Sequence, residues 1–239
     1  MITCPICNSL NINLDVICKS CGSYLQPKIE NINLFEILWL LFEDPKKGLK
    51  TVAIARHKNF LLFFSALFGI SLMYLLFEVL KIYDHWDKPI LILVVGALSG
   101  IPLGFLTLVF LSLLTLITGK IFKLIKINFK QIYTTITFST TPFIYILFFL
   151  FPVKLITYGI HIFSINPSPM VINPTVYWII LILTGVFLVY FLFLMIISMN
   201  ILFEVKSLRA FFLIFIIIST VSIGYFFLLN YIQHHILSI

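Results

Sequence analysis

Charged residues are scarce in this sequence of 239 residues. Lysine, arginine, aspartate and glutamate make up 10% of it, whereas a typical soluble domain contains about 25%. Hydrophobic residues make up 61% and include 26 phenylalanines. Residues 89–119, for example, contain no charged residue at all. These absences argue against an ordinary soluble protein and predict an all-α protein embedded in a membrane.

Catalytic and nucleic-acid-binding motifs are also missing. The sequence contains no His-Glu-x-x-His motif, no serine–histidine couple within a hydrophobic stretch and no pair of aspartates in such a stretch. The basic residues behind the net charge of +7 lie between hydrophobic stretches rather than in a motif that binds RNA or DNA. We therefore expect neither an enzyme nor a nucleic-acid-binding protein.

Cysteine is absent after residue 21. The four cysteines before that point form two C-x2-C pairs. Two such pairs can close a tetrahedral structural zinc site, which leaves no coordination position open for catalysis. Two disulfides or a redox-active pair are the alternatives, which the small size of the module and the lack of thioredoxin-like surroundings disfavour. The predicted zinc ligands are Cys4, Cys7, Cys18 and Cys21.

The segment that carries these cysteines is predicted to be a zinc ribbon over residues 1–26. Ile12, Leu14 and Val16 alternate between the two pairs, which predicts a short hairpin there. Gly22 directly after the second pair suits a tight turn. Ribbons of this kind usually stabilise a small interaction surface, so we expect this one to bind another protein.

Residues 27–58 are predicted to form a linker and interfacial amphipathic helices. Residues 34–42 are mostly apolar but too few to span a bilayer. Asp44 and Pro45 are typical of the cap and first turn of a second helix, about Pro45 to Asn59. Its basic and apolar sides predict contact with an anionic leaflet, and a solvated charged linker is the alternative. The basic residues expected at the membrane surface are Lys46, Lys47, Lys50, Arg56 and Lys58.

Five segments within residues 59–232 are long enough to cross a bilayer, because a helix rises about 1.5 Å per residue and the hydrocarbon core is about 30 Å thick. Their approximate bounds are 60–82, 89–119, 133–151, 177–203 and 210–231. Of the 16 lysines and arginines, only Lys81, Lys88 and Lys154 then fall on the side opposite the N-terminus. The positive-inside rule predicts a cytoplasmic N-terminus and an outer C-terminus. Zinc thiolates fit the same reducing compartment.

The second predicted span carries glycines four residues apart, at Gly96, Gly100 and Gly104. Small residues at this spacing share one helix face and let two membrane helices approach closely. We therefore expect this span to be the hub against which the other spans pack. The alternative explanation of the three glycines is that glycine is simply common in membrane helices. Pro102 is expected to bend this helix.

The third predicted span opens with six hydroxyl side chains among residues 134–141. We expect them to hydrogen-bond across helices and, beside Thr141 and Pro142, to satisfy carbonyls that the proline leaves free. A permeation path is the alternative to this packing seam. Glu78 is the acid that lies well within a span, and an ion pair with Lys81 is expected rather than a proton or substrate role.

Four features together give a resemblance to a known family. They are the five spans with a cytosolic N-terminal part, the entry Asp44-Pro45-Lys46-Lys47, the glycine-rich second span with its basic loop, and Phe138-Ser-Thr-Thr-Pro142. Over about Leu34 to Tyr231 the chain resembles bacterial members of the Yip domain family (Ypt-interacting proteins), with an N-terminal zinc ribbon added. The resemblance implies an integral protein of the bacterial plasma membrane without known catalytic residues.

Two functions remain open at this point. The first is a membrane scaffold or adaptor whose ribbon recruits a cytosolic protein, in membrane organisation or trafficking. The second is a component of a lipid or small-molecule transport system. Proteins of the paraquat-inducible A type also place cysteine-pair ribbons before membrane helices, although they carry more helices. A wide lateral cleft lined by residues 134–141 would favour transport, and a filled bundle would favour the adaptor.

Overall fold

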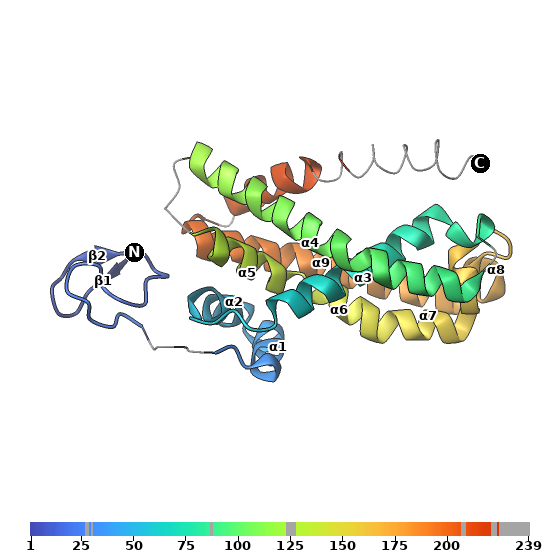
Figure 1. Ribbon diagram of the computed structural model, residues 1–239, viewed down its shortest axis with the longest axis horizontal. Helices are drawn as coiled ribbons and strands as arrows, with labels where there is room; N and C mark the ends of the chain where they lie inside the picture. Colours follow the sequence, from blue (N-terminus) through green and yellow to red (C-terminus); the bar gives the residue numbers. More distant parts are fainter. Residues whose placement is uncertain are drawn as a thin grey trace.

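The computed structural model describes most of the chain, namely residues 1–26, 29, 31–86, 88–122, 128–206, 209–220 and 224. These residues form a bundle of long helices with a small module at one end that contains two short strands (Figure 1). In chain order the elements are β1 (Ile2–Thr3), β2 (Leu10–Asn11), α1 (Leu34–Glu43), α2 (Pro45–Ile54), α3 (Leu61–Leu80), η1 (Ile82–Asp84), α4 (Pro89–Ile121), α5 (Phe129–Ser139), α6 (Thr141–Tyr145), the π-helix η2 (Ile146–Leu150), α7 (Phe151–Tyr158), η3 (Gly159–Phe163), α8 (Pro169–Ile172) and α9 (Pro174–Phe203).

Four helical segments within the described residues are long and apolar enough to cross a membrane, as expected of a membrane protein. They are Leu61–Leu80, Pro89–Ile121, Phe129–Phe163 and Pro174–Phe203. The fifth predicted span, 210–231, is described only in part, as the apolar helix Arg209–Thr220. Its continuation at 221–223 and 225–231 lies outside the described residues, so the five-span arrangement stays a prediction.

Helices α3 and α4 form the closest contact of the bundle. Gly100 and Gly104 of α4 lie against Ser65 and Gly69 of α3, and a Cβ atom added at Gly100 would come within 2.7 Å of the Cα of Ile70. Backbones can approach this closely only where side chains are missing. The glycine spacing in α4 therefore does mark a helix contact, and its partner is another glycine in the preceding helix.

Gly96 makes a different contact, with the ring of Tyr74, whose Cε1 would lie 2.6 Å from an added Cβ. The Tyr74 hydroxyl donates a hydrogen bond to the carbonyl oxygen of Leu93 (2.9 Å). The ring thus packs against the backbone of α4 at Gly96, where a side chain would collide with it. Pro102 lies inside α4 with an exposed side chain, so it takes no part in this helix contact.

The third span contains two local breaks, each explained by a proline. Pro142 has no N–H to donate to the carbonyl of Phe138, and the Thr141 hydroxyl donates to that oxygen instead (2.6 Å). Pro152 follows the π-helical turn η2, in which the N–H of Phe151 bonds five residues back to the carbonyl of Ile146. These adjustments let the span continue to Phe163, well beyond the predicted end at residue 151.

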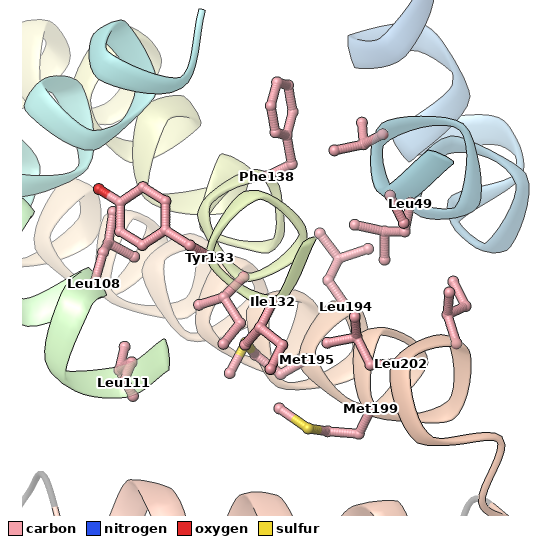
Figure 2. Close-up of a cluster of buried hydrophobic side chains, with 14 of the residues drawn as sticks. Leu49, Leu108, Leu111, Ile132, Tyr133, Phe138, Leu194, Met195, Met199 and Leu202 are labelled. Atoms are coloured by element: carbon pink, nitrogen blue, oxygen red, sulfur yellow. The ribbon is translucent and has the colours of Figure 1, made fainter. Parts of the chain in front are cut away.

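The hub of the bundle is α5, whereas the sequence suggested the second span. Every residue from Ile132 to Ser139 is buried, and Figure 2 shows apolar side chains of α2, α4 and α9 gathered around this helix. A polar helix can be enclosed because its hydroxyls donate to carbonyls one turn earlier, as Thr134, Thr135 and Thr137 do. Among the described residues, two hydroxyls of α5 also reach other helices, Ser139 to Ser198 (2.5 Å) and Tyr133 to Ser65 (3.0 Å).

Helices α1 and α2 form a hairpin beside α5 and α9. Asp44 ends α1 and caps α2, since its Oδ1 accepts from the N–H of Lys47 (3.1 Å). The buried residues Leu49 and Val52 belong to the same apolar cluster as α5 and α9. The cap agrees with the sequence prediction, but α2 ends at Ile54 rather than near residue 59.

Candidate metal centre

Each cysteine pair sits in the turn of its own small hairpin. Strands β1 and β2 pair antiparallel around Cys4 and Cys7, and a single bridge between Ile17 and Tyr24 encloses the second pair. The hairpin predicted between the pairs is wrong. Residues 12–16 turn instead, because the Asp15 carboxylate accepts from the N–H of Ile12 (3.0 Å) while the Asp15 N–H donates to the carbonyl of Ile12 (2.9 Å).

The two cysteine turns have the same backbone course. In the first, the N–H of Asn8 donates to the carbonyl of Cys4 (3.0 Å), and in the second, the N–H of Gly22 donates to that of Cys18 (3.0 Å). Asn8 and Gly22 both have positive φ, at 55° and 72°. Asparagine and glycine tolerate this conformation best. In the sequence, the similarity of the two turns is visible as the repeated pattern Cys-x2-Cys-[Asn/Gly]-Ser.

The two turns bring all four sulfur atoms together. Every pair of them lies within 4.8 Å, and Cys4–Cys21 and Cys7–Cys18 are separated by 3.6 and 3.5 Å. These distances exceed a disulfide bond, and all four cysteines are free thiols. Four sulfurs about 2.3 Å from one zinc would be roughly 3.8 Å apart in a tetrahedron. The donor set therefore fits a tetrahedral metal ion and could hold one.

Two serines that the sequence reasoning missed bridge the cysteine pairs. The Ser9 hydroxyl lies 3.1 Å from the sulfurs of both Cys7 and Cys18. The Ser23 hydroxyl lies 3.1 Å from those of Cys4 and Cys21. Each serine thus contacts one sulfur of each pair, and hydrogen bonds of this kind orient the ligands of a metal site.

The serine contacts also change the acidity of the thiols. The hydrogen bond from Ser9, together with the backbone N–H of Cys21, lowers the pKa of Cys18 to about 5. The hydrogen bond from Ser23 lowers the pKa of Cys4. Metals bind thiolates rather than thiols. The lowered pKa values of Cys4 and Cys18 therefore favour the thiolate form that binds a metal ion.

The module is docked on the end of α9 rather than tethered at a distance. The Glu204 carboxylate, directly after α9, accepts from the N–H of Asn13 (3.1 Å) and from the amino group of Met1 (2.9 Å). Leu14 is 4% exposed and belongs to the same apolar cluster as Leu202 and Phe203 of the bundle. Polar and apolar contacts together fix the position of the four-cysteine cluster against the helices.

The remaining predicted site residues lie outside this centre. Lys46, Lys47, Lys50 and Arg56 are exposed on or after α2. Lys58 instead folds back, and its Nζ donates to the carbonyl of Ala53 (2.8 Å). The six hydroxyl residues between 134 and 141 are fully buried, so they face a filled interior and not a wide cleft.

Comparisons of the chain with family models, with curated proteins and with solved structures found no match.

Proposed function

We propose that this protein is a membrane adaptor whose four-cysteine module, closed by a structural zinc ion, binds a cytosolic protein. A closed set of four sulfurs supplies shape and no catalytic position, which supports a binding role. The observation that carries the proposal is the surface of this small module, where large apolar side chains are exposed. These are Ile6 (74% exposed), Leu10 (70%), Ile17 (51%) and Tyr24 (58%).

A cytosolic position for the module is supported by the charges and aromatic residues beside it. The exposed lysines of α2 lie at the same end of the bundle as the module (Figure 1), and basic residues favour the cytoplasmic side. On α1, Phe35, Trp39 and Phe42 are exposed by 81%, 64% and 72%. Their spacing places them on one helix face, as in a helix that lies in the membrane interface. The resemblance to bacterial Yip domain proteins adds a role in membrane organisation or trafficking to this proposal.

The test is recovery of a partner from native membranes in mild detergent, with zinc measured on the same samples. The unchanged protein should carry one zinc ion per chain and a reproducible partner. Cys4→Ser should lose both. The double variant L10K/I17K should keep the zinc and lose the partner, because it changes the apolar surface without touching the sulfurs.

Ile165→Lys provides the matched control, since Ile165 is also exposed (66%) but lies at the opposite end of the bundle. It should retain both zinc and partner. Equal recovery of the partner by L10K/I17K and the unchanged protein would refute the proposed binding surface.

A further inference from the structure

An ion pair connects two membrane-spanning segments. The Lys154 ammonium of α7 lies 2.6 Å from the Glu78 carboxylate of α3, and their side chains are 8% and 28% exposed. The sequence suggested Lys81 as the partner of Glu78, and this is wrong. Ionisable groups are costly within a membrane and commonly mark sites of function.

This ion pair forms part of the wall of a cavity of about 430 Å³ between α3, α7, α8 and α9. The cavity lies at the end of the bundle far from the cysteine module, near the label α8 in Figure 1. Its volume is in the range of small-molecule sites, about 300–1,000 Å³. Val79 and Leu181 also line it and are 68% and 45% exposed. The cavity therefore reaches the surface that faces the lipid.

We propose that this cavity binds a membrane phospholipid, with the phosphate held by Lys154 and Lys81. The two lysines and Glu78 give the lining one excess positive charge, which one phosphodiester would balance. Ammonium groups bind phosphate through charge-assisted hydrogen bonds, and basic pockets between membrane helices bind lipid headgroups.

The position and shape of the site both fit a lipid. Lys81 directly follows α3, and Glu78 lies within the last turn of that helix, so the charges sit near one end of a span. Leu181 and Leu188 continue the lining along α9 with apolar side chains, against which an acyl chain can lie. Glu78 fixes the position of Lys154 and accepts one hydrogen bond from an ammonium group that has three N–H donors. The proposal concerns the end of the bundle remote from the module and does not depend on the adaptor function.

The experiment is a binding titration by native mass spectrometry on the whole protein in detergent. The probes are phosphatidylglycerol, diacylglycerol with the same acyl chains, and soluble glycerol phosphate. We expect phosphatidylglycerol to bind roughly tenfold more tightly than diacylglycerol, because one charge-assisted hydrogen bond contributes about that factor. Glycerol phosphate should not compete, since it lacks the acyl chains. Equal binding of the two lipids, or full competition by glycerol phosphate, would overturn the proposal.

Two kinds of variant localise the binding. Thr184→Phe fills the cavity without touching the ion pair, and it should abolish the preference for phosphatidylglycerol. Ile182→Phe adds the same ring to the same helix at a residue that is 64% exposed and outside the lining, and it should keep the preference. Lys154→Met should bind phosphatidylglycerol no more tightly than it binds diacylglycerol. If Thr184→Phe binds phosphatidylglycerol as tightly as the unchanged protein, the lipid binds elsewhere and the inference is wrong.

Discussion

Gly69 of α3 lies so close to Gly100 of α4 that a side chain on either residue would collide with the backbone of the other helix. A Cβ atom at Gly69 would come well within 3.0 Å of the carbonyl oxygen of Gly100, a separation that real Cβ atoms do not show. The two helices must therefore separate if either glycine is replaced.

We expect Gly69→Ala to destabilise the protein by about 2 kcal/mol or more, because the contact is between backbones and cannot repack locally. Gly185→Ala is the control, since a Cβ at this helical glycine meets nothing within 4 Å. The control should be neutral or stabilising by about 0.5–1 kcal/mol. Denaturation in detergent, followed by circular dichroism, measures both. Equal stability of the two variants would contradict the close contact.

If the module binds zinc as proposed, Ser9→Ala and Ser23→Ala should each weaken that binding by about tenfold or more, as loss of a group that orients metal ligands typically does. Because each serine contacts one sulfur of each pair, the two variants should lose similar affinity. Competition with a zinc chelator provides the measurement. Ser20→Ala is the control, since Ser20 is exposed. An unchanged zinc affinity in both Ser9→Ala and Ser23→Ala would show that the serines do not support the site.

Thr141→Val should destabilise the protein by about 1–3 kcal/mol, because the buried carbonyl of Phe138 loses the hydroxyl that satisfies it. Adding Pro142→Ala to the Thr141→Val variant should restore part of the lost stability, since alanine supplies the N–H that proline lacks. Comparing the two single variants with the double variant in denaturation measures the coupling. Simple additivity of the two effects would argue against this explanation of the break.

Burial and the nearby charge of Lys130 lower the pKa of Lys58 from an ordinary value of 10.5 to about 8. Between these two pH values the unfolded chain binds more protons than the folded chain, so stability should rise with pH across this window. Nuclear magnetic resonance of the methylated lysine measures the pKa. Lys130→Gln should raise it by removing the neighbouring charge. A pKa of Lys58 at or above 10.5 in the unchanged protein would contradict its burial.

Some of this architecture could be predicted from local patterns. The C-x2-C spacing predicted the four-sulfur cluster, and Asp44 with Pro45 predicted the start of α2, because both depend on residues close in sequence. The exact course of the cysteine module was missed because Asn8 was not recognised as the counterpart of Gly22.

Contacts between distant segments were harder to predict. Glu78 was paired with its neighbour Lys81, whereas its partner Lys154 is 76 positions away and is brought close by packing of α7 against α3. The hub was assigned to the more hydrophobic second span. A hydrophobic helix can face lipid as well as protein, so hydrophobicity alone does not identify the central helix. The more polar α5 can be enclosed because its hydroxyls donate hydrogen bonds to its own carbonyls.

The contacts of Glu204 attach the cysteine module directly to the C-terminal end of α9. This helix of 30 residues is about 45 Å long and behaves as a stiff rod. Its C-terminal end carries the module, and its N-terminal half supplies Tyr177 and Thr184 to the cavity beside Lys154. The module and the cavity therefore lie along one continuous helix, so a shift of α9 along its axis would displace both together.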